Sequence, residues 1–306
     1  MLRGVTTTAT ASPPPDRFQG LLLGSVGAVC FSGKAIIVKL SYRYGVDAVT
    51  VLMYRMFFSL PLFLALAWWS GRGRGRLTAR DWRILFLLGF TGYYLASFLD
   101  FAGLQYINAS LERLILYLNP TIVLVLGIAF FQAKVSARQW LALSISYLGV
   151  LVVFGHDIQV SGPSAALGSL LVFGSAVSYA LYLIFSGTAV NRLGSMRLAG
   201  MATSIACVLC IAQFFLLRPA AALVVAPQVL WLGILNAVLC TFLPVVLVMM
   251  AVRRVGAAAT AQTGLIGPLS TILLSVAILG EPFTVWMAAG TLLVLAGIWL
   301  LARWRA

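Results

Sequence analysis

The sequence is divided into about ten apolar runs, each close to the length that crosses a lipid bilayer. A spanning helix needs roughly 20 mostly apolar residues, and of the 306 residues here 62% are hydrophobic and 9% are charged. That composition excludes an ordinary soluble protein. The sequence therefore predicts an all-α membrane protein with ten transmembrane helices, at approximately 20–40, 48–69, 84–104, 107–131, 138–155, 166–187, 198–217, 229–251, 257–279 and 284–302.

Lysine and arginine lie mainly in alternate connections between these runs. Of the 21 basic residues, fifteen fall on the side that holds the N-terminus, three on the other side and three inside the membrane. Because loops rich in basic residues stay in the cytoplasm, we expect a multi-pass protein of the cell (inner) membrane with both termini cytoplasmic. The net charge of +14 is then a topology signal, and we expect no nucleic-acid partner.

The first 19 residues and the isolated polar residues add little chemistry. The segment 1–19 lacks the apolar core of a signal peptide, so we expect a disordered cytoplasmic tail. Cys207 and Cys210 form a C-x-x-C inside an apolar run, which favours packing over redox chemistry. His156 is expected in an outer loop. The sequence has no phosphate-binding loop, metal-ligand cluster or nucleophile beside a base, so we expect no enzyme, no metal and no cofactor.

A shift of 148 residues aligns the two halves of the chain. It places Pro120 on Pro268 and Gly149 on Gly297, and the same shift serves all ten runs. The two halves are residues 20–155 and 166–302. Each holds five spans, an odd number, so the second half must enter the membrane from the opposite side. The sequence predicts an inverted repeat, an arrangement that places substrate sites between the repeats near the membrane midplane.

The second half carries a recognisable set of motifs. Pro268 is followed by Leu279-Gly280-Glu281 and then by Gly290 and Gly297. This order of a helix proline, a Gly-Glu turn and a glycine-bearing last helix resembles the EamA domain of the drug/metabolite transporter superfamily. The resemblance extends over both halves, from about residue 20 to 302. It implies a ten-helix inverted-repeat carrier with a central cavity, and its motifs are structural, so they name no substrate.

The first half departs from that pattern. It keeps Pro120 and Gly149, but Gln132 and Ala133 stand where Gly-Glu is expected, and Ala142 replaces the glycine of the last helix.

Five ionisable side chains fall inside the apolar runs of the first half. They are Lys34, Arg55, Asp100, Glu112 and Arg113. Charge in hydrocarbon costs a few kcal/mol per residue, so such residues often mark a functional site. At a rise of about 1.5 Å per residue, all five lie between the midplane and the outer surface. They form either a structural ion network that orients the first half, or a binding layer for an anionic or zwitterionic small molecule. Such a layer would have one surplus positive charge suited to a carboxylate or phosphate group, or a carboxylate that takes up a proton during transport.

Helical geometry assigns provisional roles to these charges. Glu112 and Asp100 are the candidate proton or charge-compensating groups, and Glu112 is the better candidate to face a cavity. Arg113 points about 100° away from Glu112, so we expect it to reach a neighbouring helix, with Asp100 as partner. Lys34 and Arg55 are candidate contacts for an anionic substrate. Further candidates for the cavity wall are Tyr93, Ser97, Asn108, Asn119 and Gln262, and the candidate hinges, where a kink is expected, are Pro120 and Pro268.

These features predict a secondary transporter that moves small organic metabolites by alternating access, with export (efflux) favoured over import. Two alternatives remain open. A lipid-carrier flippase of the same fold would need a lateral opening and a wide apolar groove. An intramembrane enzyme acting on lipids would need a nucleophile, an acid/base pair or a metal at one depth, and the sequence offers carboxylates alone.

Overall fold

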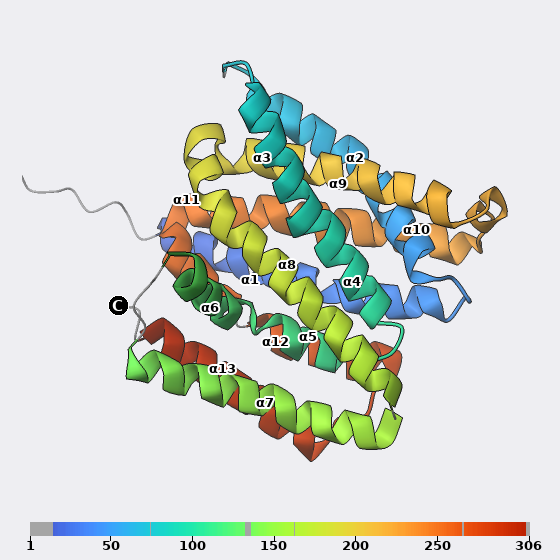
Figure 1. The fold of residues 1–306 in the computed structure, drawn as a ribbon, viewed down its shortest axis with the longest axis vertical. Helices are drawn as coiled ribbons and strands as arrows, with labels where there is room; N and C mark the ends of the chain where they lie inside the picture. Colours follow the sequence, from blue (N-terminus) through green and yellow to red (C-terminus); the bar gives the residue numbers. More distant parts are fainter. Residues whose placement is uncertain (1–14, 74, 132–135, 162, 265, 304–306) are drawn as a thin grey trace, which may run out of the picture.

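The computed structural model describes residues 15–73, 75–131, 136–161, 163–264 and 266–303, and these residues form helices joined by turns and short loops, with no strand. The helices form one bundle (Figure 1). The α-helices are α1 Pro15–Tyr42, α2 Ala48–Gly71, α3 Ala79–Gly89, α4 Ala96–Gly103, α5 Ala109–Leu116, α6 Asn119–Phe131, α7 Ala137–Ser161, α8 Pro163–Leu193, α9 Ser195–Leu217, α10 Pro227–Ala237, α11 Leu243–Thr263, α12 Ile266–Leu274 and α13 Val285–Arg303. The short segments are the π-helices η1 Phe90–Leu95, η3 Val238–Phe242 and η4 Ser275–Leu279, and the 3₁₀-helix η2 Ala220–Leu223.

The apolar helices agree with most of the expected spans. Among the described residues, eight helices are long and apolar enough to cross a membrane, and two shorter apolar helices cover Ile266–Leu279 and Val285–Leu300. The sequence predicted a turn at 252–256 between two spans, but α11 continues through these residues to Thr263. The count of ten spans therefore stays a prediction.

Helices α7 and α13 lie side by side and run antiparallel (Figure 1). A Cβ placed on Gly149 would lie 2.6 Å from the carbonyl oxygen of Gly290, and one placed on Gly297 would lie 2.7 Å from that of Ala142. The pairs 149–290 and 142–297 exchange places under the 148-residue shift. Glycine is needed here because the two backbones approach too closely for a side chain.

Helices α2 and α9 form a second antiparallel pair. Gly200 lies against Ala67, and the Cys207 Sγ lies 3.6 Å from the Met56 Sδ. Since α2 and α9 are also related by the shift, two sets of equivalent helices run antiparallel. Cys207 and Cys210 are free thiols, and both are buried in this packing as small apolar side chains are.

Irregular helix geometry recurs in both halves at the same spacing. The π-helical segments η1 and η3 begin at Phe90 and Val238, which are 148 residues apart. Pro120 is the second residue of α6 and Pro268 the third of α12. Each proline therefore stands in the first turn of a new helix, where its missing N–H is harmless. The sequence predicted instead that each proline would kink a continuous helix.

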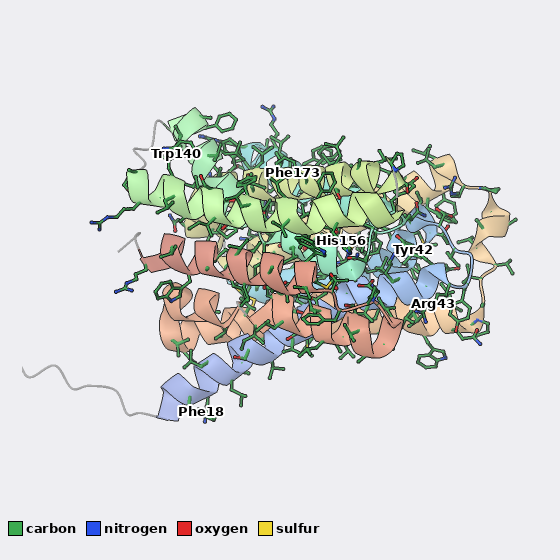
Figure 2. The ribbon with its side chains drawn as sticks, turned by 90° about the horizontal axis from the view of Figure 1, so that it is seen from below. Phe18, Tyr42, Arg43, Trp140, His156 and Phe173 are labelled. Atoms are coloured by element: carbon green, nitrogen blue, oxygen red, sulfur yellow. The ribbon has the colours of Figure 1, made fainter. Side chains whose placement is uncertain are left out.

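Two expectations at the surface of the bundle are wrong. Helix α1 begins at Pro15, so residues 15–19 are helical, whereas the rest of the expected tail lies outside the described residues. His156 lies in α7, and its ring stacks on Trp286 with 6.1 Å between centroids. Figure 2 places Phe18 at one end of the bundle and Tyr42 with Arg43 at the other. The basic-residue pattern predicts that the Phe18 end is the cytoplasmic one.

Candidate functional site

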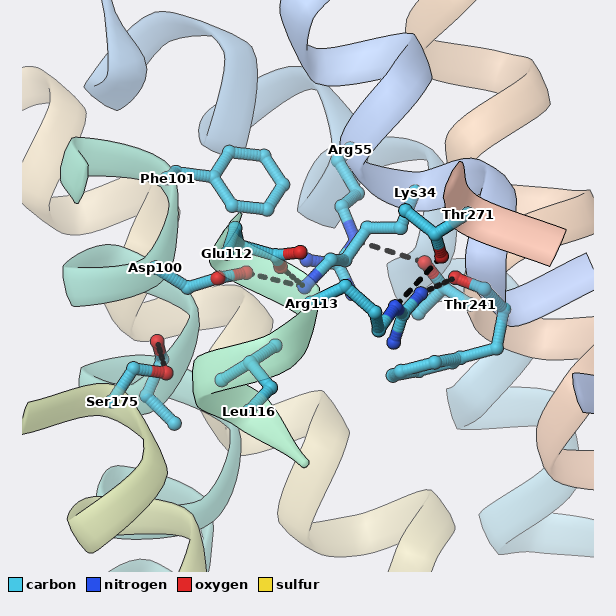
Figure 3. Close-up of polar contacts among 12 residues, drawn as sticks. Lys34, Arg55, Asp100, Phe101, Glu112, Arg113, Leu116, Ser175, Thr241 and Thr271 are labelled. Atoms are coloured by element: carbon cyan, nitrogen blue, oxygen red, sulfur yellow. Dashed lines mark hydrogen bonds and ion pairs between the residues drawn. The ribbon is translucent and has the colours of Figure 1, made fainter. Parts of the chain in front are cut away.

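The five intramembrane charges of the sequence meet inside the bundle. Each of them is almost completely buried, and the most exposed, Arg55, has 6% of its surface accessible to solvent. They come from α1, α2, α4 and α5, and Figure 3 shows them directed toward one another. Buried charges persist only when they are paired or hydrogen-bonded, so the partners of each one decide what the cluster can do.

Lys34 holds the two carboxylates together. Its ammonium group forms ion pairs with Asp100 Oδ2 and, at 3.0 Å, with Glu112 Oε1 (Figure 3). We call Lys34, Asp100 and Glu112 the ion triad. Lys34 is thus not an open contact for an anion, and the partner of Asp100 is Lys34, where the sequence suggested Arg113. Glu112 Oε2 and Asp100 Oδ1 have no hydrogen-bond donor among the described residues.

Arg113 reaches two neighbouring helices. Its Nε donates to Thr271 Oγ1 of α12 at 2.8 Å, and its Nη2 donates to the Phe31 carbonyl of α1 at 3.1 Å. The guanidinium also lies over the Phe31 ring, 5.4 Å from its centroid. A cation of the first half is in this way oriented by a hydroxyl of the second half.

Arg55 is held in a similar way. Its Nε donates to Thr241 Oγ1 at 2.8 Å, and its guanidinium lies 5.1 Å from the Phe101 ring centroid. Thr241 belongs to the π-helical segment η3, where its hydroxyl donates to the Asn236 carbonyl five residues earlier, at 2.8 Å. The widened π turn thus fixes the oxygen lone pair that receives Arg55. The Arg55 Nη1 has no partner among the described residues.

Two adjoining cavities open beside these charges. The charged cavity, of about 350 Å³, is lined by Lys34, Arg55, Asp100, Arg113, Asn119 and Thr241 among others. The inner cavity, of about 510 Å³, extends to Val190, Ser195 and Leu198, at the end of the bundle that carries the basic loops. They share six lining residues, namely Phe31, Tyr93, Arg113, Tyr117, Tyr179 and Val245. The shared wall joins the buried charges to one end of the molecule.

Glu112 and Arg113 differ from their expected orientations. Glu112 is completely buried and is absent from the lining of both cavities, whereas Arg113 lines both. Helix α5 is only eight residues long and ends at Leu116, so its rotation is set by packing against α8 and α12 and could not be extrapolated from a long span. Glu112 faces Lys34, behind the cavity wall.

The remaining candidate residues divide between the wall and other roles. Tyr93 lines both cavities, with its hydroxyl 3.2 Å from that of Tyr182. Asn108 instead caps α5, accepting from Leu111 N at 2.7 Å. Three further predicted residues line the charged cavity: Ser97, Asn119 and Pro120. Pro268 lines neither cavity. The side chain of Gln262 lies outside the described residues.

Sequence reasoning missed Tyr117 and Tyr179 of the wall, and also Thr271, which holds Arg113 from behind it. Tyr179 stacks on Tyr182 with 5.5 Å between ring centroids, and the Tyr117 hydroxyl donates to the Gly264 carbonyl. A tyrosine three residues from another on one helix is a weak signal of a shared face, and it would have found Tyr179. Nothing in the sequence distinguishes Thr271 from the other threonines of the second half.

The end of the bundle near Arg43 is held by contacts between the two halves. Glu281 Oε1 accepts from the backbone N–H of Ala109 at 2.8 Å, at the first turn of α5. Ser110 Oγ lies 2.8 Å from Ser275 Oγ and 3.1 Å from Glu281 Oε2. Arg43 donates to the Leu279 carbonyl at 2.6 Å. We call this group the outer contacts, and Glu281 is the carboxylate of the Gly-Glu turn.

An ion pair at the start of α2 also joins the two halves. Arg218 Nε lies 3.1 Å from Asp47 Oδ1, and Asp47 caps α2 by accepting from the Val49 backbone N–H at 2.9 Å. Burial acts to raise the pKa of Asp47, but hydrogen bonds from Thr50 and Arg218 outweigh it and hold the pKa below its usual value. Asp47 therefore stays ionised at neutral pH and keeps its contact with Arg218.

Comparisons with known proteins agree with this architecture. The EamA-like transporter family model matches residues 18–155 and again 166–303. Two Bacillus subtilis (strain 168) proteins are similar over most of their length. The uncharacterized transporter YcbK is 29% identical over 86% of each chain, and the uncharacterized transporter YetK is 23% identical over 92% of this chain and 86% of its own.

A solved crystal structure of another protein covers 94% of this chain and 99% of its own, with 17% identity and a TM-score of 0.63, which shows a shared fold. The two matched segments together span nearly the whole sequence. With its series of apolar helices, the molecule is a multi-pass membrane protein of the transporter type. The chain belongs to the EamA-like transporter family.

Proposed function

We propose that the protein is a secondary transporter that moves small organic metabolites across the cytoplasmic membrane by alternating access. One observation carries the proposal: four buried ionisable side chains of the first half line a cavity to whose wall the second half contributes Ser175, Tyr179, Thr241 and Val245. Intramembrane charge beside a cavity is the usual mark of a substrate or ion pathway. A site between two repeats is also where rocking of one against the other changes access.

The repeats are residues 20–155 and 166–302, five spans each, in inverted orientation. Support comes from the two antiparallel helix pairs, α2 with α9 and α7 with α13, because equivalent helices of an inverted repeat run in opposite directions. The equal spacing of η1 and η3 adds to it. Ten spans would put both termini on the same side of the membrane, and the basic-residue pattern makes that side the cytoplasm.

The structure corresponds to an inward-facing state of the proposed cycle. The inner cavity extends toward Ser195 and Leu198 at the basic, cytoplasmic end, whereas the outer contacts of Arg43, Ser110 and Glu281 hold the other end together. A cavity that faces inward loads from the cytoplasm, which is the first step of export. The ion triad supplies the carboxylates, Asp100 and Glu112, that would exchange a proton during the cycle.

Transport in proteoliposomes tests the proposal. Purified protein is screened with labelled amino acids, organic acids and nucleosides, and the pH dependence of each transported compound is recorded. We expect Glu112→Gln and Lys34→Ala to abolish transport or to remove its pH dependence, and the exposed cytoplasmic variant Arg72→Ala to transport normally. If both triad variants fold, judged by size-exclusion profile, and transport with unchanged pH dependence, the proposed role of the triad is wrong.

A further inference from the structure

The two arginines of the site are charged groups without a carboxylate partner. Among the described residues, no carboxylate oxygen lies within 4.0 Å of Arg55 or Arg113. Both side chains are at least 94% buried and both line the charged cavity. The Arg55 Nη1 also lacks any hydrogen-bond acceptor. A buried, unpaired donor on a cation is costly, so this part of the cavity is arranged to receive an anion.

Charge balance limits which anion fits. The cluster contains three cations and two carboxylates, and Lys34 is already shared by Asp100 and Glu112. One positive charge therefore remains, on the side of Arg55 and Arg113. A monovalent anion makes the buried layer neutral, whereas a divalent phosphate ester would leave an excess negative charge in a low-dielectric site. A guanidinium pairs well with the planar geometry of a carboxylate.

Most of the remaining wall is apolar and aromatic, and its other polar members are Ser97, Asn119, Ser175 and Thr241. Two tyrosine hydroxyls of the wall are engaged with the protein: that of Tyr93 with Tyr182, and that of Tyr117 with the Gly264 carbonyl. They present ring surface to the cavities. Aromatic rings favour offset or edge contacts with another ring, and the wall is completed by Phe31, Phe63, Leu116, Tyr179 and Val245.

We propose that the charged cavity binds a monovalent organic carboxylate with a flat apolar body. The carboxylate lies between Arg55 and Arg113, and the body lies among the rings of Phe31, Tyr93 and Tyr179. This substrate class rests on the proposed transport function, since the cavity is the one that the carrier would expose to each side in turn.

The second half contributes through positioning residues. Thr241 and Thr271 do not touch the proposed anion but fix the Nε edges of Arg55 and Arg113. With Arg113 Nη2 bound to the Phe31 carbonyl, the Nη groups of Arg55 and the Nη1 of Arg113 are left for the anion. Because the arginines come from one repeat and the threonines from the other, an anion held between the arginines is bound tightly only while the repeats keep this arrangement. Substrate binding is in this way sensitive to the state of the carrier.

Equilibrium binding to the purified full-length protein in detergent tests the inference. The probes are 3-phenylpropionate and four matched compounds: 3-phenylpropanol without charge, 2-phenylethylamine with the opposite charge, propionate without the ring, and phenyl phosphate with a second negative charge. We expect 3-phenylpropionate to bind and to raise the melting temperature, because a ligand stabilises the state that binds it. The matched compounds should bind at least tenfold more weakly.

Variants locate the site and identify the positioning residues. Arg55→Gln and Arg113→Gln should each weaken 3-phenylpropionate binding at least tenfold, while the exposed-arginine control Arg72→Gln leaves it unchanged. Thr241→Val should weaken binding, and Thr241→Ser, which keeps the hydroxyl, should restore it. Direct binding of labelled probe to the monodisperse fraction keeps the comparison valid for a variant with lower stability.

The outcomes separate this inference from the proposed function. The inference is overturned if 3-phenylpropionate does not bind, if the amine or the phosphate binds as well, or if the arginine variants keep full affinity. Should another compound then be transported in a Glu112-dependent way, the carrier function stands without this substrate class. Should 3-phenylpropionate bind through Arg55 while no compound crosses the membrane, the site stands and the carrier function fails.

Discussion

Removing the cation of the ion triad should destabilise the protein far more than removing the whole triad. Lys34→Met leaves Asp100 and Glu112 facing each other in a site where neither exposes more than 3% of its surface. Breaking a buried ion pair by deleting one partner costs about 3–5 kcal/mol, because the other charge stays buried. We expect the free energy of unfolding to fall by about that amount. Because Lys34 pairs with both Asp100 and Glu112, loss of the second pair lowers it further.

The triple variant Lys34→Met, Asp100→Leu, Glu112→Met removes every charge of the triad and keeps the volumes similar. Replacing a buried ion network by apolar residues is often neutral or stabilising, so we expect its stability to lie within about 1 kcal/mol of the parent protein. Its transport should be absent, because the proposed proton-exchanging carboxylates are gone. Stability and transport would thereby be separated in one molecule.

Denaturant unfolding in mixed micelles, followed by tryptophan fluorescence, measures the stability, and proteoliposome flux measures transport. Arg72→Met is the control, since removing an exposed charge usually changes stability by no more than about 0.5 kcal/mol. If Lys34→Met is as stable as the parent, the carboxylates are compensated by some other group. If the triple variant transports normally, the triad is a structural network and the proposed function loses its principal support.

Two further predictions concern contacts between the halves. Gly149→Ala should lower the free energy of unfolding by about 1–3 kcal/mol because the new Cβ meets the Gly290 carbonyl. The control Gly155→Ala, on the same helix, meets nothing within 4 Å and should be neutral or stabilising in the same unfolding assay. If both variants lose the same free energy of unfolding, the close packing at Gly149 is contradicted. Glu281→Ala removes the acceptor of the Ala109 N–H and should lower the free energy of unfolding by about 0.5–2 kcal/mol, as loss of other helix caps does. Hydrogen–deuterium exchange at the start of α5 should become faster, and unchanged exchange there would refute the assigned contact.

Much of the site followed from sequence because the apolar runs are long and the charges within them are rare. A count of residues along each run placed Lys34, Arg55 and Asp100 at one depth, and the structure brings these three into one cavity. Which of these charges pair with one another could not be predicted from the sequence. Which carboxylate meets Lys34 depends on the rotation of two short helices, α4 and α5, about their axes, and eight-residue helices leave too few periodic positions to determine it.

The contribution of the second half was hardest to predict. Thr241 and Thr271 resemble any other threonine in an apolar helix, and their role depends on close approach to arginines 186 and 158 residues away. A π-helical turn cannot be read from local sequence, yet η3 is what directs the Thr241 oxygen. Breaks such as the one before Pro120 were mistaken for kinks, since proline is compatible with both a bend and a first helical turn.

The difference between the two Gly-Glu positions bears on how the carrier would move. Glu281 caps α5 across the repeat boundary and helps to hold the outer contacts, while the equivalent position of the first half is Ala133, which has no side-chain acceptor. In the outward-facing state of an inverted repeat, that alanine would occupy the role of Glu281. We therefore expect the empty carrier to favour the inward-facing state, so that outward opening depends on differential contacts made by the substrate or proton.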